Sequence, residues 1–396
     1  MGCRKKVRLS DVAELTPGFA FKSTDFGEYS HKAIKITNIS REGYSDTFPG
    51  VDIDAYPAGK LDKYLIGEGD YYLAMTGSIG KVGRLVRGSA YLNQRVLGLK
   101  AKSQIDADYL WFVLNSADFH RHLLTHIDSH SVQANISAES VGSFEFDLPP
   151  MNVQLRIGFV LGSFDKKIIA NNRINGYLTQ LALCLYEDFR NRADGVNGTL
   201  GDLVSLQKNT IKAGQRDDLP YMPIDDIPMK SIAITELRPN EEAKSSLQTF
   251  NIDDIVVGAM RVYFHRVVLA PCEGITRNTC FVLRPHNESM REYALLTCFQ
   301  ESAIEYANVR SKGSTMPYAV WKDSFDTYPV LIPSEQALNK FSKQVAPIIN
   351  RIRDSYFENK KLMDLRDALL PKLMSGEIDV SKVEVPTPPN SHLCEC

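Results

Sequence analysis

Four histidines lie close together in the first half of the chain: His120, His122, His126 and His130. If one helix ran through all of them, the last three would share a face, and imidazoles arranged in this way can bind a metal ion. No cysteine or carboxylate stands where it would complete such a site, and the run crosses an expected helix end. We therefore predict no metal site. A polar patch that faces a nucleic acid and ordinary surface histidines both stay open as interpretations.

Three catalytic signatures are incomplete in this chain. Neither Pro-Pro pair, at 149–150 and 388–389, stands in the Asp/Asn-Pro-Pro-aromatic loop of an amino-methyltransferase. The stretch Gly77–Val82 is too short for a phosphate-binding loop, and we expect a tight turn before a strand there. Glu358 and Lys360 match only part of a nuclease motif and lie within a helical pattern. We predict that the chain is not an enzyme, with no catalytic residue and no cofactor of its own.

Basic side chains follow the expected tight turn, and clusters of amide, hydroxyl and basic side chains occur further along the chain, a combination that suits the reading of DNA. Asn and Gln can pair with adenine, Arg with guanine, and Lys with backbone phosphates. Lys81 and Arg87 project to one face of the expected strand and Arg84 to the other, so at least one of the three is expected to be structural. For each candidate the alternative is that it only keeps a loop soluble. The predicted contacts are Lys81, Arg84, Asn93, Gln94, Arg95, Ser131 and Gln133 in the first half, and Arg261, Arg266, Arg277, Asn278, Arg310 and Lys312 in the second.

The composition limits the class of protein. The chain has 396 residues, of which 43% are hydrophobic and 24% charged, so we expect several globular domains. Its net charge of −2 excludes a histone-like or non-specific binder, so any DNA surface must be a local patch. No apolar run approaches the ~20 residues of a membrane-spanning helix. The 7 scattered cysteines are an odd number, which indicates a reducing compartment, and we predict a cytoplasmic protein.

The chain repeats itself. Four segments of the first half recur in the same order in the second half, which indicates two similar domains. Each copy combines short β-rich runs with one helix, Asp108–Leu124 or Met290–Ala307, and then a polar loop and a last strand that ends in proline. The first copy also has an expected strand at Lys32–Ile39. The recurring pairs are Leu9–Val12 with Leu200–Leu203, Gly69–Met75 with Asp253–Met260, Asn93-Gln94 with Arg277-Asn278, and Phe146–Pro150 with Tyr328–Pro333.

A long helical pattern follows each copy, over residues 151–192 and 334–380, with Pro150 and Pro333 as helix-entry residues. Each pattern covers ~40 residues, or ~60 Å at the rise of an α-helix. Apolar residues alternate at spacings of four and three, which predicts an antiparallel coiled coil with asparagines that fix its register. The alternative is that each helix only covers its own domain. The predicted seam consists of Ile157, Leu161, Phe164, Ile168, Asn171, Leu178 and Leu185, and of Phe341, Val345, Ile348, Ile352, Tyr356, Asn359, Met363 and Leu370.

Three motifs resemble one known family. Leu148–Ile157 resembles the junction at which a target recognition domain meets a conserved helix, and Leu365–Ile378 resembles the signature that ends a second conserved helix. Thr76–Gly83 resembles the Gly-Ser-Ile-Gly turn of the recognition domains. Over nearly its whole length the chain resembles the specificity subunit of type I restriction–modification enzymes (HsdS). Met260–Arg266 in the second copy departs from the Gly-rich turn, and Ile332–Gln336 keeps only part of the junction.

The resemblance implies an α+β fold in which two similar target recognition domains with β-rich cores are joined by two long conserved helices in a pseudo-twofold repeat. It assigns residues 1–150 and 193–333 to the recognition domains, 151–192 and 334–380 to the helices, and 381–396 to a disordered tail. Each domain would read one half of a bipartite asymmetric DNA target while the helices set the spacing and dock two methyltransferase subunits.

Those partners would use S-adenosylmethionine, and restriction subunits would join them. The alternatives are a type IIB-like or other phage-defence methylation system and, from another class, a coiled-coil adaptor that binds proteins.

Overall fold

The computed structural model describes residues 4–39, 44–45, 48–127, 134–244 and 246–385. The chain forms two compact units. Unit 1 consists of Met1–Phe164 and Leu365–Cys396, and unit 2 of Asp165–Asp364. The long helices α5 (Met151–Arg192) and α8 (Glu335–Ser375) each contribute residues to both units. Among the described residues, no helix combines the length and apolarity that crossing a membrane requires.

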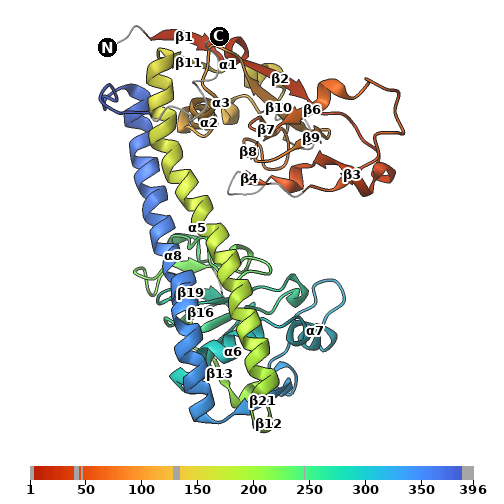
Figure 1. Ribbon diagram of the computed structural model, residues 1–396, viewed down its shortest axis with the longest axis vertical. Helices are drawn as coiled ribbons and strands as arrows, with labels where there is room; N and C mark the ends of the chain where they lie inside the picture. The colour runs from red at the N-terminus through yellow and green to blue at the C-terminus, as the bar shows by residue number, and fades with distance from the viewer. Residues whose placement is uncertain (1–3, 40–43, 46–47, 128–133, 245, 386–396) are drawn as a thin grey trace, which may run out of the picture. The chain divides into compact units, whose positions relative to one another are not determined.

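Unit 1 is built on two small sheets and one strand pair. The first sheet has the order β2 (Ala13–Pro17), β10 (Val96–Ala101), β7 (Tyr71–Ala74), β8 (Val82–Leu85), β4 (Tyr44–Ser45). The second has the order β5 (Gly50–Val51), β3 (Phe26–Ile34), β9 (Ser89–Leu92), β6 (Leu65–Gly67), and β1 (Lys5–Arg8) pairs with β11 (Glu145–Leu148). Helices α1 (Leu9–Val12), α2 (Ala107–Leu114), α3 (Ala117–Thr125) and α4 (Ala138–Gly142) complete the unit. Figure 1 shows α2 and α3 beside β7, and their apolar residues share one core with β7, β8 and β10.

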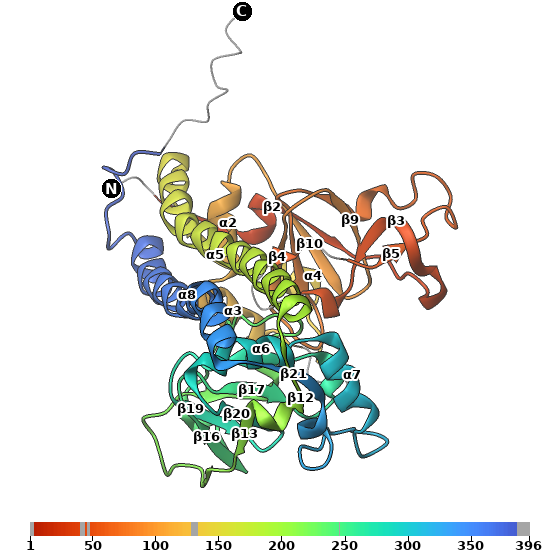
Figure 2. The same ribbon diagram turned by 60° about the horizontal axis from the view of Figure 1, so that its bottom comes forward.

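Unit 2 repeats this plan. One sheet has the order β13 (Val204–Gln207), β20 (Cys280–Pro285), β17 (Ile255–Gly258), β18 (Val267–Leu269), and Figure 2 shows β13, β20 and β17 side by side. The other has the order β14 (Thr210–Ile211), β16 (Leu247–Phe250), β19 (Gly274–Arg277), β15 (Tyr221–Met222), and β12 (Gly195–Thr199) pairs with β21 (Pro329–Pro333). The helices are α6 (Arg291–Cys298) and α7 (Glu301–Val309).

The repeat read from the sequence is confirmed by four strands of the first sheet in each unit. In unit 1, β2, β10, β7 and β8 neighbour each other in the order in which β13, β20, β17 and β18 do in unit 2. The register between the strands agrees as well. Val96 of β10 pairs with Ala74 of β7, and at the equivalent position Cys280 of β20 pairs with Gly258 of β17. Each copy also begins with the same turn, in which an aspartate accepts a hydrogen bond from the backbone N–H three residues earlier, at 2.9 Å for Asp11 and 2.8 Å for Asp202.

Three local predictions were wrong in detail. The single helix expected over Asp108–Leu124 is two helices, because Ser116 starts a new one by accepting a hydrogen bond from the N–H of Phe119 at 3.2 Å. The helix expected over Met290–Ala307 divides likewise into α6 and α7. The strand expected over Lys32–Ile39 ends at Ile34, and a short 3₁₀ turn follows, since Asn38 accepts a hydrogen bond from the N–H of Lys35 at 3.1 Å.

The long helices begin in two different ways. In α5 the carbonyl of Pro150 accepts the first hydrogen bonds, from Val153 at 2.9 Å and Gln154 at 3.1 Å. Pro333 is not the helix-entry residue that we expected, because it is the last residue of β21. Instead, the Ser334 hydroxyl accepts a hydrogen bond from the N–H of Ala337, as an N-cap does. Helix α8 ends at Ser375, before the end of the predicted helical pattern at residue 380, and Gly376 follows with a φ of +80°, the left-handed conformation of a helix terminus.

Within unit 2 the two helices run antiparallel and contact each other through a buried polar ladder. Asn171 donates to the Asn359 side chain at 2.8 Å, and Asn175 donates to Ser355 at 2.6 Å. At the edge of the ladder Lys167 forms an ion pair with Glu358 at 3.2 Å, so Glu358 belongs to the helix surface rather than to a nuclease site. Asn359 in turn donates to the side-chain oxygen of Asn172 at 3.0 Å. Because these donors and acceptors match in this alignment, the ladder favours one register of the two helices.

The predicted seam residues also pack against the β-rich cores, so the helices pair with each other and cover their domains at the same time. Val345 and Ile352 share the core of unit 2 with β17 and α6, and Tyr356 packs into a smaller cluster around Phe250. Buried seam residues are Ile157, Leu161, Asn171, Phe341, Val345, Ile352, Tyr356 and Asn359, and partly buried ones are Phe164, Ile168, Leu178, Leu185, Ile348, Met363 and Leu370.

Candidate nucleic-acid interface

In unit 1, three loop segments meet at the end of strand β7. The N–H of Met75 donates to the carbonyl of Arg95 at 2.9 Å, and the N–H of Ile136 donates to the carbonyl of Met75 at 3.0 Å. A further bridge joins Thr76 to Asn135. The β7–β8 turn, the β9–β10 turn and the polar segment before α4 thus form one surface, which we call face 1 (residues 75–81, 93–95 and 134–136).

The β7–β8 turn needs its glycines. Gly77 and Gly80 have φ values of +71° and +84°, a region that favours residues without a Cβ. A Cβ on Gly80 would lie 3.0 Å from Leu123 and 3.2 Å from the His120 ring, so the turn packs directly on α3. Burial lowers the pKa of His120, which keeps that imidazole neutral near pH 7. The turn presents Ser78 and Lys81 to solvent.

The β9–β10 turn is closed by a hydrogen bond from the N–H of Val96 to the carbonyl of Asn93 at 3.1 Å. Gln94 and Arg95 at its tip are exposed, and Arg95 has a left-handed backbone with a φ of +68°. Asn93 is half-buried and its side-chain oxygen is enclosed, so it supports the turn more than it projects from it. Face 1 therefore brings together Lys81, Gln94 and Arg95, a cation and two groups that can pair with bases.

Unit 2 builds the corresponding surface from the same backbone contacts. Ala259 donates its N–H to the carbonyl of Thr279 at 2.8 Å and accepts from Ala319 at 2.8 Å. These pairs correspond to Met75 with Arg95 and Ile136. The N–H of Arg261 donates to the carbonyl of Pro317 at 2.7 Å. Lys312 and Tyr318 exchange two backbone hydrogen bonds of 2.9 Å each. We call this surface face 2 (residues 259–266, 277–279 and 310–319).

The two faces share a frame and carry different side chains. In face 2 the Gly-rich turn is replaced by a segment in which Arg261 and His265 take left-handed backbone conformations, with φ values of +50° and +54°. Its exposed polar side chains include Arg277, Asn278 and Lys312. Both surfaces can therefore pair with bases and phosphates, but with different patterns of donors and acceptors.

Comparisons with known proteins agree with this architecture. The family profile described as the type I restriction modification DNA specificity domain matches residues 4–180. The MjaIX specificity subunit of Methanocaldococcus jannaschii, a type I restriction enzyme subunit, is 23% identical over 322 residues, 74% of this chain and 73% of its own. The HindI specificity subunit of Haemophilus influenzae is 31% identical over 94 residues, 24% of this chain and 20% of its own. The chain is thus similar to type I restriction–modification specificity subunits over most of its length, and residues 4–180 match their DNA specificity domain.

A solved structure shares the fold of this chain. The type I restriction–modification S subunit from M. genitalium aligns with a TM-score of 0.54 at 14% identity, over 94% of this chain and 96% of that one. The expectation of a non-catalytic subunit agrees with the relatives, which are named specificity subunits. Among the described residues, no three His, Cys, Asp or Glu side chains form a group that could hold a metal ion.

The motif at Leu148–Ile157 has a structural explanation in this chain. Gln154 is 1% exposed, and its side-chain oxygen accepts a hydrogen bond from the N–H of Asp106 at 2.8 Å. Its side-chain nitrogen donates to the carbonyls of Pro149 at 2.8 Å and Gln104 at 3.3 Å. One buried amide therefore ties the start of α5 to the loop that precedes α2.

Two of the predicted DNA contacts, Arg84 and Arg266, bind other residues of their own unit. Arg84 forms an ion pair with Asp108 at 2.6 Å, next to Tyr71. Arg266 donates to the carbonyls of Ile224 and Asp225 at 2.9 and 3.0 Å. These two arginines hold parts of their own unit together.

Arg310 lies at the end of α7, with its guanidinium 3.5 Å from the centre of the Tyr306 ring. Ser131 and Gln133 lie outside the described residues. Sequence reasoning missed two exposed aromatic side chains of face 2, Tyr263 and Tyr318, which are 46% and 49% exposed. The available signal for Tyr318 was its place in the repeat, because it occupies the position of Asn135 in face 1.

Proposed function

We propose that face 1 and face 2 each read one half of a bipartite, asymmetric DNA target. The observation that carries this proposal is that one loop framework occurs in both units with different polar side chains. A common frame presents each set to DNA in a similar way, and the different side chains select different bases. In face 1, Arg95 and Gln94 contact base edges and Lys81 contacts a phosphate. In face 2, Arg277 and Asn278 contact bases, and Arg261 and Lys312 contact phosphates.

The proposed role of the long helices is to set the distance between the half-sites. Support comes from their length, since α5 has 42 residues and α8 has 41, and each contributes to both units. The buried ladder of Asn171, Asn175, Ser355 and Asn359 resists sliding of one helix along the other. A fixed register predicts one preferred spacer.

We further propose that α5 docks a modification subunit. Three exposed apolar residues follow each other along the unit 2 part of this helix at spacings of three and four: Ile174, Tyr177 and Leu181, which are 42%, 70% and 47% exposed. An apolar stripe of this kind on a surface helix is typical of an interaction site. The partner that fits is the methyltransferase subunit with which specificity subunits assemble. That partner supplies S-adenosylmethionine and the methylation chemistry, and restriction subunits join the same complex.

The test is a mobility-shift measurement with the subunit in complex with its modification partner. We expect tight binding to a duplex with both half-sites at one spacing. A duplex that keeps only one half-site should bind at least about a thousandfold more weakly, near the level of non-specific binding. Binding that is indifferent to the spacer would contradict the role of the helices, and binding that needs only one half-site would contradict the role of the second face.

A further inference from the structure

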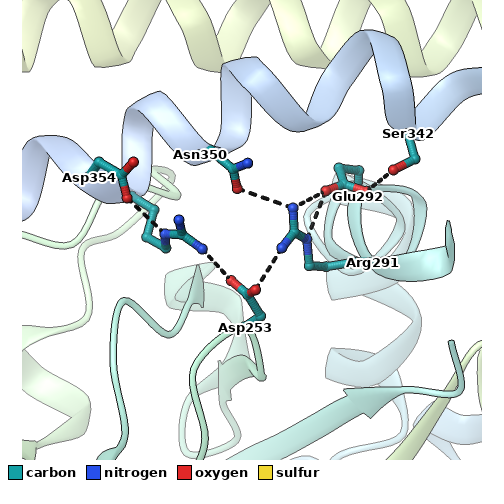
Figure 3. Close-up of polar contacts among 7 residues, drawn as sticks. Asp253, Arg291, Glu292, Ser342, Asn350 and Asp354 are labelled. Atoms are coloured by element: carbon teal, nitrogen blue, oxygen red, sulfur yellow. Dashed lines mark hydrogen bonds and ion pairs between the residues drawn. The ribbon is translucent and has the colours of Figure 1, made fainter. Parts of the chain in front are cut away.

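A network of charged residues ties the β-rich part of unit 2 to helix α8. Asp253 lies in the turn between β16 and β17, Arg291 and Glu292 begin α6, and Ser342, Asn350 and Arg353 lie on α8. Figure 3 shows how these side chains converge between the turn, α6 and the long helix. We call this group of six residues the clamp.

Asp253 is the centre of the clamp. One of its carboxylate oxygens accepts from Arg353 at 2.7 Å, and the other accepts from Arg291 at 2.6 Å. Arg291 also reaches the side-chain oxygen of Asn350 at 3.1 Å. A single carboxylate therefore joins a guanidinium from the β-rich domain to one from the helix, and both arginines are largely buried.

Glu292 is fully buried and has one partner on α6 and one on α8. It forms an ion pair with Arg291 at 2.6 Å and accepts a hydrogen bond from the Ser342 hydroxyl of α8 at 2.9 Å. A buried carboxylate that lost these partners would be left without compensation for its missing hydration. The domain can therefore not tilt on α8 without uncovering charges, and the contact resists small changes of orientation.

The backbone of Asp253, in the turn between β16 and β17, has an unusual conformation. Its φ of +67° is left-handed, which is unfavourable for a residue with a Cβ. The equivalent position in unit 1 is Gly69, with a φ of +90°, and the two turns share their hydrogen bonds. Unit 2 thus has an aspartate where the backbone favours glycine, and the carboxylate supplies the bridge. In unit 1 the counterpart of Glu292 is Asp108, which pairs with Arg84 on β8 and not with a long helix.

We infer that the clamp is a positioning device: Asp253, Arg291 and Arg353 fix the orientation of the second reading domain on α8, and through it the spacer length that the subunit accepts. This inference rests on the proposed function. One extra base pair turns a half-site by about a tenth of a turn around the DNA axis. A domain held in one orientation rejects that rotation, whereas a loosened domain can follow it.

The decisive variant is Asp253→Gly, because it removes the bridging carboxylate and also suits the left-handed backbone, so the turn should still form. Asp323→Gly is the matched control. Asp323 also has a left-handed backbone, with a φ of +57°, and lies exposed in the same unit outside the clamp. Glycine removes the backbone strain there without removing a bridge. Arg353→Met is a second variant that breaks the bridge from the helix side and keeps most of the side-chain volume.

Two measurements on the complex with its modification partner test the inference. Hydrogen exchange should become about tenfold faster in α6 of Asp253→Gly. Binding to a library of duplexes with different spacers gives the second readout. The ratio of affinities for the best spacer and for one a base pair longer should fall by about tenfold in Asp253→Gly, a usual size for coupling within one ion-pair network. Arg353→Met should behave alike, and Asp323→Gly should match the wild type.

The outcomes separate the inference from the proposed function. Faster exchange with an unchanged spacer preference, or no change in either measurement, would overturn the inference. A wild-type complex that shows no spacer preference would overturn the proposed function and the inference that rests on it. That failure is visible without any variant, so the two cannot be confused.

Discussion

Arg95 and Lys81 are the residues at which base reading and phosphate binding can be told apart. Arg95 lies exposed at the tip of the β9–β10 turn, and Lys81 lies exposed at the end of the β7–β8 turn. An arginine that pairs with a guanine contributes about 1–3 kcal/mol of discrimination against other bases. A lysine at a phosphate contributes equally to all sequences.

We therefore expect Arg95→Ala to relax specificity at one position of one half-site, and Lys81→Ala to weaken binding to every sequence and to reduce the salt slope by about one unit. Binding to a library of half-sites at several salt concentrations measures both effects. Lys361→Ala on the exposed face of α8 is the control for loss of a positive charge. If both variants changed all sequences equally, the assignment of Arg95 would be wrong.

The sequence identified the candidate side chains but not their partners. Lys81, Arg84 and Arg266 look alike as basic residues near a turn, yet Arg84 has Asp108 as a partner and Arg266 has carbonyls of residues 224 and 225. These partners are 24 and about 40 residues distant in sequence, so local pattern could not reveal them. The clamp was missed for the same reason, because its members come from a turn, a short helix and a long helix.

At the scale of elements, periodicity predicted the long helices well. A repeat of apolar residues over ~40 positions is a strong signal. The exact ends were less predictable, because α8 begins after Ser334 and ends at Ser375. The short helices were less predictable, because a continuous apolar pattern over Asp108–Leu124 conceals the break that Ser116 introduces. The capping hydrogen bond of one hydroxyl decides that boundary.

The polar ladder between α5 and α8 allows a prediction of stability. Asn359→Leu removes the partner of the buried Asn171 side chain, which should cost about 1–3 kcal/mol. The double variant Asn171→Leu/Asn359→Leu should regain much of this loss, because neither buried amide then remains to be satisfied. Urea denaturation of the four proteins of this cycle measures the coupling. Strictly additive losses would show that the two amides do not depend on each other.

At the scale of the whole molecule, the apolar stripe on α5 should govern assembly. Tyr177→Glu places a charge on a side chain that is 70% exposed, so the isolated subunit should keep its stability. Binding of the modification subunit should fall at least about tenfold, because the charge would have to be desolvated in the contact. Co-purification and light scattering measure this, with the exposed Gln180→Glu as the control. Unchanged assembly in Tyr177→Glu would place the docking surface elsewhere.

The central claim is that two faces on one chain read a bipartite target at fixed spacing, and genome-wide mapping of N6-methyladenine in cells with and without the gene tests it most directly. The account predicts one asymmetric motif, with two short half-sites separated by a constant number of unspecified base pairs, whose methylation disappears when the gene is deleted. Methylation that persists after deletion, or that depends on an uninterrupted motif or on half-sites at variable spacing, would contradict it.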